Sequence, residues 1–229
     1  QLSAERLQHK LEAKLQSDDA SLLKRSVATI VAQVQAMKQL VNEFRDYARL
    51  PAATLAPLNL NALVHDVLAL YGEALEHGRL AAACAPELPW IVGDATQLRQ
   101  VIHNLVQNGL DAVAERPHGQ VRVSTEPVRN EIGELRAVRL AVHDNGPGFA
   151  EKVLKRAFEP YVTTKSKGTG LGLAVVKKIA DEHGARVRIG NRGSGDGCAG
   201  GGAQVSLSFS NLAAPPSVDT LQPATPRAH

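Results

Sequence analysis

The chain has 229 residues, of which 44% are hydrophobic and 21% charged, so it is long enough for one large or two small cores. The net charge is only +3 and no basic run contains interleaved aromatic residues, which argues against direct nucleic-acid binding. Cys84 and Cys198 lack metal-ligand spacing and fit a reducing compartment. No signal peptide or membrane span is evident. The chain begins inside an amphipathic pattern without Met, so we expect a fragment of a longer protein.

The first fifty residues predict two helices separated by a turn at Ser17-Asp18-Asp19. The first helix has Leu7, Leu11 and Leu15 on one side. In the second, apolar residues recur at alternating spacings of four and three until Pro51 ends the pattern: Leu23, Val27, Ile30, Val34, Met37, Val41, Phe44 and Ala48. Such a heptad seam predicts a helical hairpin over residues 1–51 that forms a dimeric four-helix bundle, a homodimer through residues 22–48. A helix packed on its own globular core is the alternative.

Residues 51–60 read as a linker, after which the pattern changes. Helical and strand patterns mix without alternating as βαβ units, which predicts an α+β domain over residues 52–211. A short apolar run lies at residues 88–92. We expect helices at 61–76, 96–114 and 169–183, and strands at 121–125, 138–142, 186–189 and 204–209. Residues 212–229 hold four of the twelve prolines and are expected to be a disordered tail.

The helix predicted at 96–114 has a polar face. Asn104, Asn108 and Asp111 fall at i, i+4 and i+7, away from the apolar stripe. Asn costs a helix several tenths of a kcal/mol relative to Ala, so two stacked Asn side chains suggest a function. Their oxygens, with a carboxylate one turn further on, form an edge suited to Mg²⁺. A solvated polar face is the alternative.

A carboxylate followed by a glycine-rich turn comes next, in Asp144-Asn145-Gly146-Pro147-Gly148. At the end of an apolar strand, this carboxylate can accept a hydrogen bond from an exocyclic amine while the glycine backbone passes close by. The same composition is also ideal for a plain turn.

A second glycine-rich segment opens the helix predicted at 169–183. It contains Lys165, Lys167 and the run Gly168-Thr169-Gly170-Leu171-Gly172. Backbone N–H groups and the helix dipole favour phosphate there, although the segment fits neither the Walker nor the Rossmann pattern. A flexible loop is the alternative. A last segment, Gly200-Gly201-Gly202-Ala203, is by itself only a turn.

The order and spacing of these segments resemble the N, G1, F, G2 and G3 boxes of the ATP-binding domain of sensor histidine kinases. This is the Bergerat (GHKL) fold shared with gyrase, Hsp90 and MutL, an α/β sandwich with a mixed sheet packed on helices. The resemblance covers residues 58–209. Asn104 and Asn108 match the N box, Asp144, Gly146 and Gly148 the G1 box, and Gly168, Gly170 and Gly172 the G2 box. Phe158-Glu159-Pro160-Tyr161 with Thr163-Thr164-Lys165 resembles the F box.

The resemblance implies a protein-histidine kinase with ATP and Mg²⁺ as cofactors. Asn108 would be the metal ligand and Asp144 the acceptor for adenine N6. Asn104 would be the catalytic residue that orients the attacking imidazole, unless a carboxylate of the preceding segment does so. The implied nucleotide-binding set is Asn104, Asn108, Asp111, Asp144, Gly146, Gly148, Lys165, Lys167, Gly168, Thr169, Gly170, Leu171 and Gly172.

The helical hairpin resembles the dimerisation and phosphotransfer domain of the same kinases, in particular nitrogen-regulation sensors of the NtrY type. Residues 1–7 resemble the segment just after their phosphoacceptor box, and residues 44–51 the end of their second helix. The resemblance implies an acceptor histidine about ten residues before Gln1 and an NtrX-like response-regulator receiver domain as partner. It also implies the cytoplasmic part of an inner-membrane bacterial sensor, attached to the membrane only through further N-terminal segments. His9 is a poor acceptor because Lys10, not an acid, comes directly after it.

Two other functions stay open. An ATP-driven machine of the gyrase or Hsp90 type needs a Glu four residues before the metal-binding Asn. Asn104 stands there, and an amide cannot act as a general base. A non-catalytic nucleotide-binding dimer module is the other possibility. The chain departs from the kinase pattern at Gly109, where Ala is usual and Gly costs about 1 kcal/mol of helix stability. It also departs at Tyr161-Val162, where Phe-Phe is more typical, and at residues 193–201, a stretch longer and richer in glycine than usual.

Overall fold

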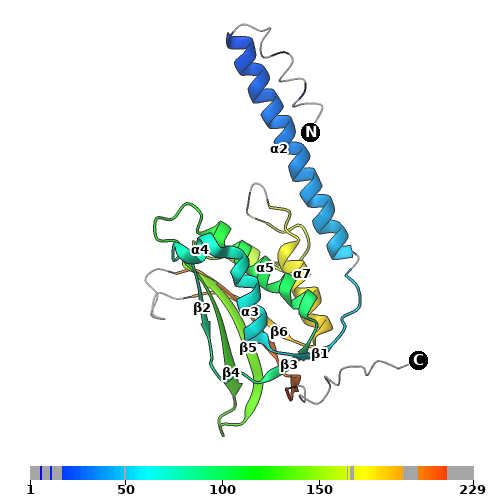
Figure 1. Ribbon diagram of the computed structural model, residues 1–229, viewed down its shortest axis with the longest axis vertical. Coiled ribbons are helices and arrows are strands. Elements are labelled where there is room, and N and C mark those ends of the chain that lie inside the picture. Colours follow the sequence, from blue (N-terminus) through cyan, green and yellow to red (C-terminus); the bar gives the residue numbers. More distant parts are fainter. Residues whose placement is uncertain are drawn as a thin grey trace, which may run out of the picture.

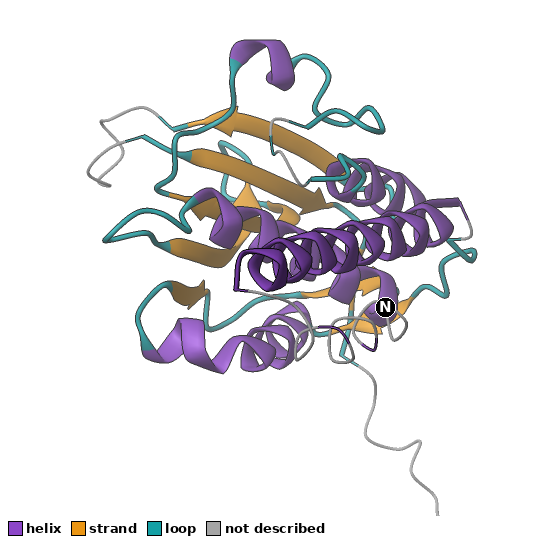
Figure 2. Ribbon diagram, turned by 90° about the horizontal axis from the view of Figure 1, so that it is seen from above, coloured by secondary structure: helices purple, strands orange, loops and turns teal. Residues whose placement is uncertain are grey.

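A computed structural model describes residues 6, 11, 17–48, 50–163, 165, 168–192 and 201–215. One long helix, α2 (Ser17–Ala48), projects from a two-layer domain in which the main helices lie on one face of a sheet (Figures 1 and 2). The first predicted helix of the hairpin lies outside the described residues, so the structure describes one helix of the pair. Within the described part of the chain, no helix has the length and apolarity needed to cross a membrane.

Helix α2 agrees with the predicted second helix, except at its start. Asp18 and Asp19 lie in its first turn, where their charges favour the positive end of the helix dipole. The turn predicted at residues 17–19 is therefore wrong, because these residues begin the helix instead of preceding it. The helix ends at Ala48, shortly before Pro51, as expected. Val27 is buried, but most large apolar side chains of the helix are exposed: Leu22, Ile30, Met37, Leu40, Val41 and Phe44.

The main sheet has five strands in the order β2-β4-β5-β7-β6. Strand β2 (Leu80–Cys84) runs parallel to β4 (Val121–Arg129), and the other neighbours are antiparallel. They are β5 (Leu135–Asp144), β7 (Ala203–Phe209) and β6 (Arg186–Asn191). This mixed sheet covered by helices confirms the α+β class. A second sheet, in the order β1-β3-β8, joins β1 (Ala56–Leu58), β3 (Trp90–Gly93) and β8 (Leu212–Ala213).

Four of these strands were not predicted: β1, β2, β3 and β8. β3 overlaps the short apolar run at residues 88–92. β1 lies in the expected linker and β8 in the expected disordered tail, so the ordered chain continues past residue 211. Both pair with β3, which is distant in sequence, and neither is long enough to show an alternating pattern. β2 is rich in alanine and has three exposed residues in succession, which removes the apolar alternation that predicts a strand.

Helix α5 (Ala95–Ala112) is the centre of the helical layer and agrees with the helix predicted at 96–114. The helix predicted at 61–76 is instead broken into α3 (Leu60–Leu68), a 3₁₀ turn η1 (Ala69–Tyr71) and α4 (Gly72–Glu76). The tighter turn rotates the chain, so Leu70 is 73% exposed and does not share the apolar side with Leu63 and Val67. Helix α7 (Gly172–Glu182) packs against α5, and the short helix α6 (Glu151–Leu154) comes before it in the chain.

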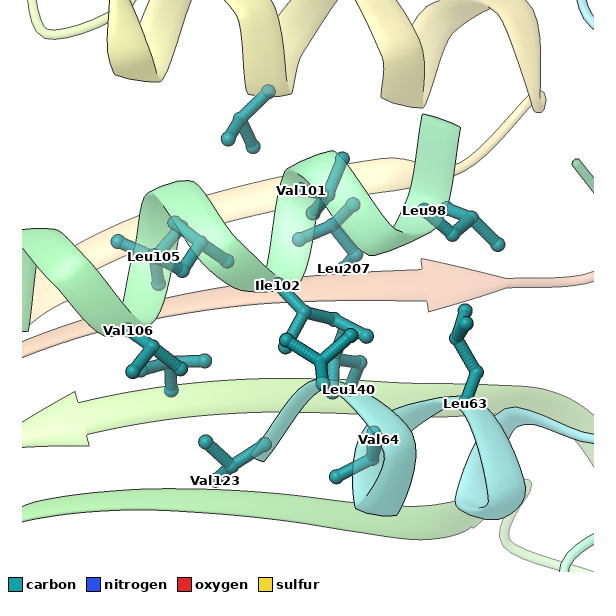
Figure 3. Close-up of a cluster of buried hydrophobic side chains, with 14 of the residues drawn as sticks. Leu63, Val64, Leu98, Val101, Ile102, Leu105, Val106, Val123, Leu140 and Leu207 are labelled. Carbon is teal, nitrogen blue, oxygen red and sulfur yellow. The ribbon is translucent and has the colours of Figure 1, made fainter. Parts of the chain in front are cut away.

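The core lies between α5, α3 and the strands, as Figure 3 shows. Burying each of these aliphatic side chains contributes about 1.5–3 kcal/mol. Side chains of α5 face those of the sheet and of α3: Leu98, Val101, Ile102, Leu105 and Val106 meet Val123, Leu140, Leu207, Leu63 and Val64. At Gly109, an added Cβ would lie 3.0 Å from both methyl groups of Val121. Glycine therefore lets α5 lie close to β4, which explains why Ala is absent there.

Polar contacts join the end of α2 and the segment after it to the domain. Lys178 on α7 donates to the carbonyl of Tyr47 at 3.0 Å and lies 5.5 Å above the centre of its ring. Gln97 donates to the carbonyl of Pro51 at 2.8 Å, and the Thr54 amide donates to Asp94 at 2.8 Å. The long helix is thus attached through its C-terminal end.

Candidate functional site

The polar face of α5 is the first part of the site. Asp94 caps the helix by accepting from the amides of Thr96 and Gln97, at 2.8 and 3.0 Å. Because the apolar stripe of α5 is buried in the core, its opposite side carries Asn104 and Asn108, both half-buried, and the more exposed Asp111. The predicted grouping on one helix face is therefore present.

Lys165 lies against this face although it is distant in the chain. Its Nζ donates to Asn108 Oδ1 at 3.1 Å and to Asp111 Oδ2 at 2.8 Å. Gln107 donates to the other oxygen of Asp111 at 2.8 Å. The amide and the carboxylate thus converge on one cation, and oxygens of this kind are the ligands that Mg²⁺ prefers. The residues present fit a magnesium ion that takes its remaining ligands from phosphate and water, since the described residues hold no cluster of three His, Cys, Asp or Glu.

Asp144 ends β5 and forms the second part of the site. Its Oδ1 accepts from the amides of Gly146 at 2.7 Å and Ala203 at 3.3 Å. No described residue donates to its Oδ2, which leaves that oxygen for a ligand donor. Burial raises the pKa of the carboxyl, opposed by these two hydrogen bonds and by the charges of Arg116 and Lys165.

Glycines are required around Asp144 because the backbone approaches it closely. A Cβ on Gly146 would lie 2.7 Å from Asp144 Oδ1. A Cβ on Gly202 would lie 1.9 Å from the Asp144 carbonyl oxygen. Gly202 belongs to the segment that by itself suggested only a turn. The structure shows that it also packs against the backbone of Asp144, the predicted ligand-binding residue.

The loop before α7 is the third part. Gly170 has a φ of +72°, and a Cβ there would lie 2.6 Å from the carbonyl carbon of Tyr161. The Tyr161 amide donates to the Gly170 carbonyl at 3.1 Å and holds the two ends of the loop together. Tyr161 itself has a φ of 66° and a 58% exposed side chain.

This loop meets the polar face of α5 at the start of α7. A Cβ on Gly172 would lie 3.4 Å from Asn108 Nδ2. Leu171 is fully buried, and its amide lies 3.4 Å from Thr169 Oγ1. A Cβ on Gly168 would lie 2.6 Å from Thr163 Oγ1. Lys167 lies outside the described residues.

Asn104 lies one helical turn before Asn108, on the same face. Its neighbour His103 shares a hydrogen bond of 2.7 Å between its Nδ1 and the Tyr71 hydroxyl. Burial raises the pKa of Tyr71, and the charge of Asp111 adds to the effect. His103 therefore has a structural partner outside the proposed site. The catalytic role of Asn104 stays a prediction.

Two asparagines that shape the site were missed. Asn145 accepts from the Gln120 amide and donates to the His118 carbonyl, both at 2.8 Å, which ties the turn after Asp144 to the loop after α5. Asn191 contacts Phe149 from the end of β6. Asn145 could have been recognised from its position in the glycine- and proline-rich turn, where Asn side chains often bond to the backbone. No local signal marks Asn191, because its partner is distant in the chain.

Comparison with known proteins agrees with this geometry. Residues 93–212 match the family described as histidine kinase-, DNA gyrase B-, and HSP90-like ATPase, and the chain belongs to this family. It is 31% identical over 202 residues to the nitrogen regulation protein NtrY of Azorhizobium caulinodans, covering 86% of this chain and 25% of that protein. The chain spans 25% to 49% of the length of the first curated relatives it matches.

Solved structures of histidine kinases have the same fold. The catalytic domain of histidine kinase ThkA is 29% identical with a TM-score of 0.56, over 69% of this chain and 95% of that one. Full-length ShkA in complex with AMPPNP is 25% identical with a TM-score of 0.60, over 93% of this chain and 46% of that one. ThkA in complex with the response regulator TrrA has a TM-score of 0.65 at 22% identity, over 91% of this chain and 57% of that one, a likeness of fold.

Proposed function

We propose that this chain is the ATP-binding catalytic core of a two-component sensor and acts as a protein-histidine kinase. The observation that carries the proposal is the convergence of three parts: the oxygens of Asn108 and Asp111, the Oδ2 of Asp144, to which no described residue donates, and the glycine loop before α7. ATP would bind between them, with adenine at Asp144 and the phosphates at the loop. The complex of the related ShkA with AMPPNP supports this assignment.

Adenine would be recognised by Asp144. The oxygen Oδ2 can accept a hydrogen bond from the exocyclic amine of adenine, whereas guanine presents a carbonyl at the corresponding position. Because Oδ1 is held by Gly146 and Ala203, the direction of Oδ2 is set before the ligand arrives. The proposal therefore includes selection of ATP over GTP.

The phosphates would lie beside Asn108, Asp111 and the loop at 168–172. Asn108 and Asp111 would hold Mg²⁺, which, when bound, neutralises charge on the phosphates during phosphoryl transfer. Lys165, and Lys167 two positions further on in sequence, would contact phosphate oxygens, so Lys165 would leave Asn108 when nucleotide binds. The backbone amides at the start of α7 add donors with the favourable sign of the helix dipole.

The phosphoryl acceptor would be a histidine and not water. Hydrolysis of the gyrase or Hsp90 kind needs a general base four residues before Asn108, and the amide of Asn104 cannot take a proton. Asn104 would instead orient the attacking imidazole. We place this imidazole in the part of the intact protein that precedes residue 1. From it the phosphoryl group would pass to an aspartate of an NtrX-like receiver domain, as the complex of ThkA with a response regulator suggests.

The long helix would supply the dimer contact. Its exposed apolar side chains include Ile30, Met37 and Val41, all on the predicted heptad seam. A face of this kind is typical of a four-helix bundle made from two copies of a hairpin. In the intact protein, this bundle would connect the catalytic core to an inner-membrane sensor, with the core in the cytoplasm.

Calorimetric titration of the chain with AMPPNP, with and without Mg²⁺, tests the nucleotide site, and GTP in place of ATP tests its selectivity. Transfer is tested by γ-³²P-ATP labelling with and without an added acceptor segment that contains the upstream histidine. We expect magnesium-dependent binding of the adenine nucleotide and acid-labile label on the added segment. Binding without any label would favour a non-catalytic nucleotide-binding module, and absence of binding would refute the proposal.

A further inference from the structure

The side chain of Asn191 holds both backbone polar groups of one residue. Its Oδ1 accepts from the Phe149 amide at 2.7 Å, and its Nδ2 donates to the Phe149 carbonyl at 2.7 Å. A carboxamide that makes both bonds imitates one rung of a β-ladder, although the two residues are 42 positions apart. Phe149 comes directly after the Asp144 turn and begins the segment that leads to Lys165.

The glycine before Phe149 makes room for this contact. Gly148 has a φ of +77°, and a Cβ there would lie 2.8 Å from Asn191 Oδ1. A side chain at residue 148 would therefore displace the carboxamide as well as strain the backbone. The contact with Asn191 therefore explains why the last residue of the turn is a glycine.

The backbone of Asn191 is also connected to the adenine-binding carboxylate. Asn191 is opposite Ala203 in the β6–β7 ladder, and the amide of Ala203 donates to Asp144 Oδ1. The next amide, of Arg192, donates to the Gly202 carbonyl at 2.9 Å. Asn191 therefore links the sheet end that holds Asp144 to Phe149, the first residue after the Gly-rich turn.

We propose that Asn191 is a positioning residue of the nucleotide site, a role that rests on the function proposed above. By fixing Phe149 to the end of β6, it sets where the described segment 149–163 leaves the sheet and runs toward the proposed phosphate site. It also keeps the turn at Gly146–Gly148 in the conformation that directs Asp144 Oδ2 toward adenine. The other end of this segment is held separately, by the bond between Tyr161 and Gly170.

The test compares Asn191→Ala, Asn191→Asp and a control, Asn130→Ala. Asn130 also makes two side-chain hydrogen bonds, both to Glu134, but in the turn at the opposite end of β5. Three quantities are measured for each variant: the thermal midpoint, amide exchange of residues 149–163 without nucleotide, and the dissociation constant of Mg-AMPPNP.

For Asn191→Ala we expect faster exchange confined to residues 149–163 and nucleotide binding weaker by about three- to tenfold, the scale of losing one or two hydrogen bonds. Asn191→Asp keeps the acceptor for the Phe149 amide but presents a second acceptor to its carbonyl. It should therefore retain protection of that amide and bind nucleotide with intermediate affinity. Asn130→Ala should match the parent in both measurements, even if its thermal midpoint falls.

Parental affinity in Asn191→Ala would overturn the positioning role, and so would a loss of affinity accompanied by faster exchange throughout the core. Should Asn191→Ala fail to fold, Asn191→Asp decides, because parental affinity in that variant also overturns the role. A parent chain that binds no nucleotide refutes the proposed function and this role with it. That result is distinct from a parent that binds nucleotide and a variant that binds it equally well.

Discussion

Asp144→Asn separates ligand recognition from stability, because the two respond in opposite directions. The substituted amide keeps one oxygen, which is expected to stay with the donors Gly146 and Ala203. The NH₂ group then takes the place of Oδ2, so a donor faces the amine of adenine. Losing a charged acceptor and gaining a repelling donor should weaken ATP binding by about 1–3 kcal/mol, roughly five- to 150-fold.

The stability of the nucleotide-free chain should rise in the same variant. The pKa of Asp144 is raised because burial disfavours its charged form more than the hydrogen bonds and the charges of Arg116 and Lys165 favour it. A raised pKa means that the folded state binds more protons than the unfolded state between the two pKa values, so the parent loses stability as pH increases through that window. The neutral amide has no such loss. The stability advantage of Asp144→Asn should therefore appear as pH increases through this window and stay constant above it.

Calorimetry with ATP and thermal unfolding at several pH values measure the two effects. Asp144→Ala serves as a comparison, because it removes the acceptor without adding a donor and leaves two amides without their partner. Parental ATP affinity in Asp144→Asn would show that Asp144 only builds the turn. A nucleotide-free variant less stable than the parent at neutral pH would refute the assigned direction of the pKa shift.

Four further results are expected. Asn108→Ala should abolish the magnesium-dependent part of ATP binding, measured by calorimetry with and without Mg²⁺, and an unchanged magnesium dependence would contradict its role as metal ligand. Amide exchange over residues 149–163 should slow when nucleotide is added, because loops beside a phosphate site become ordered when phosphate binds, whereas full protection in the free chain would contradict this expectation. Gly109→Ala should lower the thermal midpoint, since crowding against Val121 outweighs a helix gain of about 1 kcal/mol, and a rise in the midpoint would show that α5 can move away from β4. The chain alone should bind ATP without acid-labile label from γ-³²P-ATP, and strong label mapped to His9 would contradict an acceptor outside this chain.

The long amphipathic elements of the domain could be predicted because their periodicity is local. Helix α5 buries one face, and in strands β4, β6 and β7 the apolar residues recur at every second position. Strand β1 could not be predicted because its existence depends on pairing with β3, and three residues give no period. The segment after Asn59 shows that a local pattern can also mislead. Its apolar residues recur as in one continuous helix, but a 3₁₀ turn interrupts the helix and leaves Leu70 exposed to solvent.

The candidate site also combines residues that could be predicted from local sequence with residues that could not. Asn104, Asn108 and Asp144 could be identified because each occurs in a short motif whose spacing has a chemical reason. The position of Lys165 against Asn108 and Asp111 could not, because a contact between residues distant in the chain leaves no local pattern in the sequence. Asn191 was missed for the same reason.

Strand register determines how the parts of the site meet. Asp144 is opposite Val121 in the β4–β5 ladder, and Val121 is the residue against which Gly109 of α5 packs. Asn108 and Asp111 flank Gly109 in the helix, so the close approach permitted by glycine sets the separation between the proposed metal-binding face and the proposed adenine acceptor. A slip of one residue in β5 would turn Asp144 to the other face of the sheet and would also remove it from Ala203. The glycine that departs from the usual kinase pattern is thus part of the geometry that joins the two halves of the proposed nucleotide site.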